Sequence, residues 1–168
     1  MGQNWKVINK TLGIIEILLG ISVIILTIYS WHTVLTQLEH FGLNWEKISF
    51  FKLIKQSHFV FLSGVLGMIS GILLLKGKRW GWITSVSSFL VYSIGMILIA
   101  LGTNNKGKVL LEDEGDYIIP GVLLIVFLVL TFLLALKPIR ELYSIKIRDW
   151  VIVGTKVLLF TLDKLIIN

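Results

Sequence analysis

The stretch TLGIIEILLGISVIILTIYSW at Thr11–Trp31 contains 21 residues and one charged side chain, Glu16. A helix of this length covers about 30 Å, the thickness of the hydrocarbon core of a bilayer. Three further apolar runs follow at 59–75, 83–101 and 118–136. Uninterrupted runs of this kind satisfy their backbone in lipid as helices. The sequence therefore predicts four transmembrane helices.

The composition agrees with lipid as the solvent. The chain has 168 residues, of which 55% are hydrophobic and 15% charged, and its mean hydropathy is +0.86. These values exclude an ordinary soluble domain. The expected fold class is an all-α integral membrane protein, with a four-helix transmembrane bundle at residues 1–136 and the lipid bilayer as its first partner. Because the chain has no cysteine, disulfides and thiolate chemistry are excluded.

The distribution of cations predicts an orientation. Lys47, Lys52, Lys55, Lys106 and Lys108 fall on one side of the four predicted spans, and the other 11 of the 16 Lys and Arg residues fall on the opposite side. The positive-inside rule then places both termini and the Lys76–Gly81 turn in the cytoplasm, with two longer loops outside. We expect a multi-pass protein of the cell (plasma) membrane. The net charge of +6 is explained by this orientation, so no nucleic acid partner is expected.

Residues 137–168 form the last segment. Trp150–Ile167 is largely apolar but carries Lys156, Asp163 and Lys164. At 100° per residue Asp149, Lys156 and Asp163 share one stripe of a helix, which favours a cytoplasmic interfacial helix with its charged edge toward water. The alternative is a fifth span.

Glu16 is the only charged residue well inside a predicted span, and a carboxylate within a membrane segment is a candidate functional site. Ser85, Ser88 and Tyr92 of the third span share one helix face at spacings of three and four. We expect their hydroxyls to bind Glu16 as an interhelical polar contact. The alternative is a proton or cation relay through Glu16.

Small residues predict the helix-packing faces. They recur at seven-residue or small-xxx-small spacing, which lets helix backbones approach closely. The residues are Gly13, Gly20, Gly64, Gly67, Gly71 and Gly95. Packing within the chain is the expected use, and homodimerisation is the alternative.

The two predicted outer loops carry the remaining candidate residues, which we expect to contact a partner at the outer surface. These are His32, His40 and His58 of the first loop, and Glu112, Asp113, Glu114 and Asp116 of the second. The apolar residues of the 32–58 segment predict an interfacial element that caps the bundle. The histidines match no zinc-ligand spacing and the acids no EF-hand, so no metal is predicted.

No motif places a nucleophile, a base and an orienting group together. The sequence therefore predicts neither an enzyme nor a cofactor. A non-catalytic interaction protein is expected: a subunit, an accessory factor or a toxin-neutralising partner of a membrane protein. The alternative is a small proton-coupled transporter that uses Glu16. Small multidrug transporters also have four spans and a carboxylate in the first, but they have short loops and no counterpart of residues 137–168, so no family is assigned.

Overall fold

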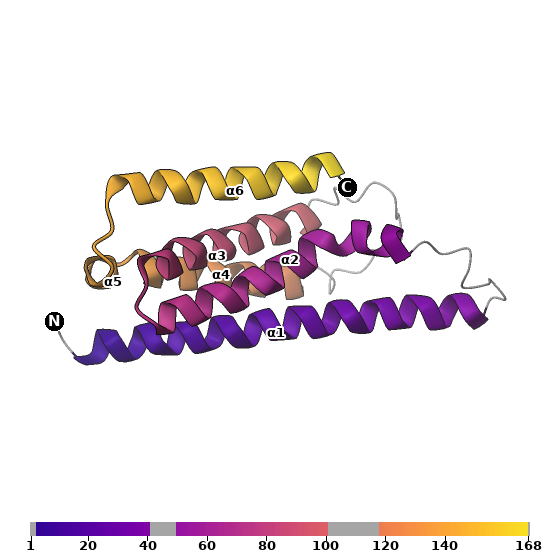
Figure 1. The fold of residues 1–168 in the computed structure, drawn as a ribbon, viewed down its shortest axis with the longest axis horizontal. Helices are drawn as coiled ribbons and strands as arrows, with labels where there is room; N and C mark the ends of the chain where they lie inside the picture. The colour runs from indigo at the N-terminus through magenta and orange to yellow at the C-terminus, as the bar shows by residue number, and fades with distance from the viewer. Residues whose placement is uncertain (1–2, 41–49, 101–117, 168) are drawn as a thin grey trace.

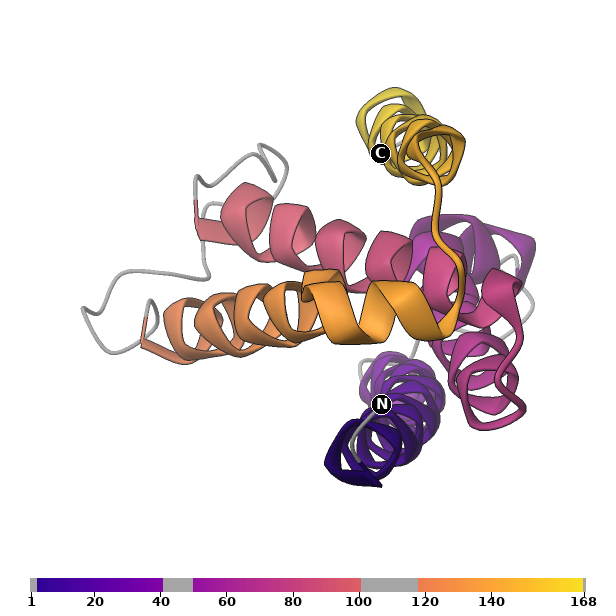
Figure 2. The same ribbon diagram turned by 90° about the vertical axis from the view of Figure 1, so that its left-hand side faces the viewer.

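A computed structural model describes residues 3–40, 50–100 and 118–167, and every regular element within them is a helix. The helices are α1 (Gln3–His40), α2 (Phe50–Leu75), α3 (Arg79–Ala100), α4 (Ile118–Ala135), α5 (Lys137–Leu142) and α6 (Ile147–Ile167). α1 and α6 run lengthwise along the molecule (Figure 1), and α3 and α4 cross them at an angle (Figure 2). The predicted all-α fold is confirmed.

Four of these helices are long and apolar enough to cross a membrane. By length and composition, the candidate spans are Asn4–Thr36, Ser57–Leu75, Arg79–Leu98 and Ile118–Ala135. Each contains or closely matches one of the four apolar runs of the sequence. These four candidate spans indicate a membrane protein.

α1 and α2 are longer than the apolar runs that predicted them. At 1.5 Å per residue, the 38 residues of α1 extend over about 57 Å, whereas the 18 residues of α4 extend over about 27 Å. Residues 32–40 continue α1, and residues 50–58 belong to α2. The predicted cap over residues 32–58 is therefore wrong for these parts, and residues 41–49 lie outside the described residues.

Each of the first four helices packs on the next in chain order, with α6 on α3. Trp82 and Leu134, both fully buried, join α3 to α4, because the Trp82 indole donates a hydrogen bond of 2.8 Å to the Leu134 carbonyl. The Trp150 ring of α6 lies nearly perpendicular to the same indole, with ring centroids 5.1 Å apart. α3 is therefore the helix against which both α4 and α6 are fixed.

The α2–α3 turn and α5 lie at one end of the molecule, which we call the basic end because the turn contains Lys76 and Lys78 (Figure 1). Gly77 allows this tight turn, since its φ of +66° is one that other residues rarely adopt. The Tyr143 hydroxyl accepts a hydrogen bond of 2.7 Å from the Asn9 amide and donates one of 3.1 Å to the Leu74 carbonyl. These bonds connect the start of α1 to the α5–α6 connection.

α6 lies along the bundle and not across its end (Figures 1 and 2). Its charged stripe faces α2 and α3, where Asp149 contacts Arg79 and Asp163 contacts His58. The outward face is apolar, with Val151, Leu158, Leu159 and Leu162 exposed. The prediction that the charged edge faces water is corrected for Asp149 and Asp163, because both bind residues of the bundle, while the interfacial placement of the helix stays a prediction. The start of α1 and the end of α6 lie at opposite ends of the molecule (Figure 1).

Candidate functional site

Glu16 lies where α1, α2 and α3 meet, and its side chain is completely buried. The Ser70 hydroxyl of α2 donates a hydrogen bond to its Oε1 atom, and the Ser85 hydroxyl of α3 donates one of 2.5 Å to its Oε2 atom. Each carboxylate oxygen therefore has a hydroxyl partner. Glu16 joins three helices through polar contacts that compensate part of the cost of burying it.

Of the two hydroxyl partners of Glu16, only Ser85 is predicted by the sequence. Ser85 binds Glu16, whereas Ser88 lines a cavity on another side of α3. The Tyr92 hydroxyl donates to the Ser63 carbonyl at 2.7 Å and so joins α3 to α2. Ser70 was missed, although it lies within the small-residue face of α2, next to Gly71.

Glycines on α1 and α2 let the two backbones come into direct contact. A Cβ atom added at Gly20 would lie 2.6 Å from the Gly64 carbonyl oxygen, and one at Gly71 would lie 2.6 Å from the Gly13 carbonyl oxygen. Real Cβ atoms do not approach other atoms this closely. Packing within the chain thus accounts for these four positions.

The other two predicted packing glycines differ from each other. A Cβ atom at Gly67 would lie 2.9 Å from the Tyr92 hydroxyl, so this glycine leaves room for α3. A Cβ atom at Gly95 would have nothing within 4 Å. Gly95 therefore does not serve as a close-packing position among the described residues.

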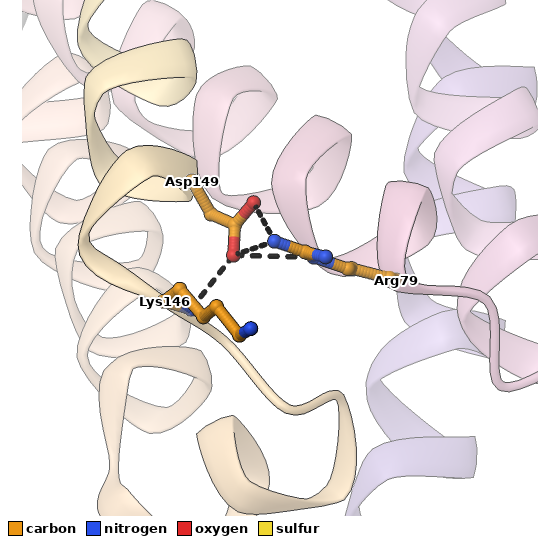
Figure 3. A network of polar contacts seen from close by, with 3 residues as sticks. All are labelled: Arg79, Lys146 and Asp149. Atoms are coloured by element: carbon orange, nitrogen blue, oxygen red, sulfur yellow. Dashed lines mark hydrogen bonds and ion pairs between the residues drawn. The ribbon is translucent and has the colours of Figure 1, made fainter.

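An ion pair fixes the start of α6 to the start of α3 (Figure 3). The Arg79 Nη2 atom lies 2.5 Å and 2.6 Å from the two Asp149 oxygens, and the Lys146 backbone amide donates to Oδ2 at 2.7 Å. Burial by itself raises the pKa of Asp149, but the Lys146 amide and the Arg79 guanidinium outweigh it and hold that pKa below its ordinary value. Asp149 thus caps α6 and anchors it.

A second contact fixes the far end of α6. The His58 Nε2 atom lies 3.0 Å from the Asp163 Oδ2 atom, and the rings of Phe59 and Phe160 meet edge to face with centroids 6.2 Å apart. His58, expected at an outer surface, therefore contacts α6 within the chain.

The remaining outer-loop candidates are not brought together by the described structure. His32 is exposed on α1. The side chain of His40 and all of Glu112, Asp113, Glu114 and Asp116 lie outside the described residues. Within the part of the chain that is described, no group of three or more His, Asp or Glu side chains could hold a metal ion.

A cavity of about 100 Å³ lies where α6 covers the groove between α2 and α3. Its lining comes from Ser63, Leu66, Thr84, Ser87, Ser88, Val91, Lys156 and Phe160. A wider cavity of about 250 Å³ lies between α1 and α2 near Trp31 and Ser57. Glu16 lines neither of the two.

Comparisons of the chain with protein-family models, curated proteins and solved structures find no match.

Proposed function

We propose that this chain is a non-catalytic membrane protein that acts by binding a second membrane protein through an arm formed by α1 and α2. The arm comprises residues 32–40 of α1 and 50–58 of α2. The supporting observation is that α1 and α2 continue past the ends of α3 and α4 at the end opposite to the basic end (Figure 1).

The arm has the stiffness that a recognition element needs. The Trp31 indole donates a hydrogen bond of 2.7 Å to the Ser57 hydroxyl, and its ring stacks on Phe61 with centroids 6.0 Å apart. These contacts hold the bases of the two arm helices together. A helix pair fixed in this way presents side chains with little ordering cost on binding. Val34, which is 38% exposed, is one such side chain.

The orientation belongs to the same proposal. We propose that the basic end lies on the cytoplasmic side of a cell membrane, because Lys and Arg are in excess there, and that the arm lies on the outer side. The partner would then be reached on the outer side. α6, with its charged stripe against the bundle and its apolar face outward, is proposed as a fifth membrane-embedded helix.

Site-specific photo-crosslinking in cells tests the arm. A crosslinker at Val34 is expected to give one discrete heavier product, whereas a crosslinker at Ile125, an exposed α4 residue, serves as the matched control. The product should co-purify with the chain in mild detergent at a fixed ratio. Equal labelling from both positions, or none from Val34, contradicts the proposal.

A proton-coupled transporter is the second candidate, supported by the position of Glu16 at a junction of three helices. Its complete burial, away from both cavities, favours the structural role. Uptake driven by a pH gradient in liposomes that contain only this chain would reverse the order of the two candidates.

A further inference from the structure

The cavity between α2, α3 and α6 has one charged group in its lining, Lys156. The Lys156 side chain is half-buried, and its ammonium lies over the Trp80 ring, 5.2 Å from the centroid. Trp80 lies in the first turn of α3, at the basic end. Lys156 therefore directs its charge from the cavity toward that end of the molecule, as a snorkelling lysine does.

No carboxylate neutralises Lys156 within the described residues. The acids whose side chains are described there are all engaged with other groups: Glu16 with Ser70 and Ser85, Glu141 with Lys137, Asp149 with Arg79, and Asp163 with His58. A half-buried cation without a counter-charge favours an anionic ligand.

Three of the four hydroxyl groups of the lining, those of Ser63, Thr84 and Ser87, do not compete for that role. The Ser63 hydroxyl donates to the Val60 carbonyl, and the Ser87 hydroxyl donates to the Ile83 carbonyl. Thr84 likewise donates to its own helix, at the Trp80 carbonyl. With these three hydrogens committed, the donors that can face a ligand are the Lys156 ammonium and the Ser88 hydroxyl, and of the two only Lys156 carries a charge that favours an anion.

The remainder of the cavity suits a hydrocarbon chain. Leu66, Val91 and Phe160 line it, and Phe59 closes against Phe160 on the side away from the basic end. A volume of about 100 Å³ is below that of an engineered apolar cavity of about 150 Å³ that accepts benzene. It therefore fits a segment of one acyl chain.

We propose that this cavity binds one anionic phospholipid from the leaflet at the basic end, with its phosphate at the Lys156 ammonium. The acyl chain enters between Val91 and Phe160. α3 and α6 run in the same direction from the basic end (Figure 1), so Phe160 lies further from that end than Lys156. Head and chain are thus ordered as in a lipid of that leaflet.

Native mass spectrometry of the full chain in non-ionic detergent tests the site. With phosphatidylglycerol and phosphatidylcholine as competing probes, we expect one retained phosphatidylglycerol. Lys156→Gln should weaken its retention about fivefold, the effect of about 1 kcal/mol for one lysine at an anionic surface. Lys137→Gln is the matched control, because its side chain is 80% exposed at the same end, and it should retain the lipid.

Two further experiments distinguish a bound lipid from a free anion and from a general effect of charge. Ser87→Leu, which adds bulk to the cavity wall, should reduce retention of both lipids while the variant stays monodisperse. Inorganic phosphate should leave the thermal stability of wild type and Lys156→Gln equally unchanged. Unaltered phosphatidylglycerol retention by Lys156→Gln, or stabilisation of wild type alone by inorganic phosphate, overturns the assignment.

Discussion

The Arg79 guanidinium binds both oxygens of the Asp149 carboxylate, and this ion pair joins the first turns of α3 and α6 across 70 positions of sequence. The Asp149 side chain is 1% exposed and that of Arg79 is 32% exposed. The carboxylate also accepts a hydrogen bond from the Lys146 backbone amide. The same carboxylate therefore caps the start of α6 and binds that helix to the bundle. Together with the His58–Asp163 contact, it attaches α6 to the bundle near both of its ends.

Removing the Asp149 carboxylate should loosen α6 more than removing an exposed acid. Asp149→Ala leaves the Arg79 guanidinium and the Lys146 amide without their partner, and we expect a loss of about 2 kcal/mol in the free energy of unfolding. Glu141→Ala is the control, since its pair with Lys137 is exposed and 3.9 Å long, and it should change that energy by less than about 0.5 kcal/mol. Unfolding in detergent measures both, and equal effects would contradict an anchoring role.

The same pair predicts an acid dependence. The pKa of folded Asp149 lies below its ordinary value of 3.8. Ionised Asp149 therefore stabilises the folded form above that value, and this contribution disappears as the pH falls through the lowered pKa. We expect the Tm of wild type to fall below pH 3.8 more steeply than that of Asp149→Asn. Parallel Tm curves for the two proteins would show that Asp149 is not the group responsible.

Two substitutions at Glu16 distinguish a structural contact from a proton relay. Glu16→Gln retains an oxygen and a donor for Ser70 and Ser85, so we expect folding, detergent stability and partner binding to persist. Glu16→Leu removes the polar contact and should weaken the bundle by about 1 kcal/mol, the usual scale for hydrogen bonds between membrane helices. Thermal unfolding and the crosslinking assay provide the measurements. If wild type shows uptake driven by a pH gradient, a Glu16→Gln protein that is stable but has lost this uptake would support the relay.

The glycines give a matched pair of alanine substitutions. Gly20→Ala places a Cβ atom 2.6 Å from the Gly64 carbonyl oxygen and 2.7 Å from the Met68 backbone nitrogen, so α1 and α2 must separate. We expect a loss of about 1–3 kcal/mol, as for other overpacked sites. Gly95→Ala meets nothing within 4 Å and should be neutral or stabilising by up to about 1 kcal/mol, because alanine favours helix. A Tm for Gly20→Ala at or above that of Gly95→Ala would contradict the close contact.

Hydropathy predicted the four apolar runs because lipid allows few charged residues within a span. It did not predict where the helices end. α1 continues through the polar stretch beyond Trp31 to His40, and there Thr33 and Thr36 donate hydrogen bonds from their hydroxyls to backbone carbonyls of the same helix. A change from apolar to polar sequence marks the limit of the hydrocarbon, while the backbone hydrogen bonds of a helix persist outside it.

The candidate site was predictable only in part for a different reason. Periodicity placed Ser85 on a face that could reach Glu16, and the sequence offered a small-residue face on α2, but nothing local selected Ser70. Likewise, periodicity identified the charged stripe of α6 without revealing whether water or protein lies opposite. Arg79 and His58, the partners that decide this, are 70 and 105 positions away from Asp149 and Asp163.

The position of α6 relative to the membrane gives the last prediction. The chain has no cysteine, so single cysteines can be introduced at Lys78, Lys106 and Lys164 and labelled with an impermeant maleimide in intact and opened cells. If α6 is a fifth embedded helix, the cysteine at 164 should be labelled from the same side as the one at 106. The cysteine at 78 should require opened cells. An interfacial α6 at the basic end would instead place the cysteines at 164 and 78 on one side, and labelling of those two together would refute the embedded arrangement.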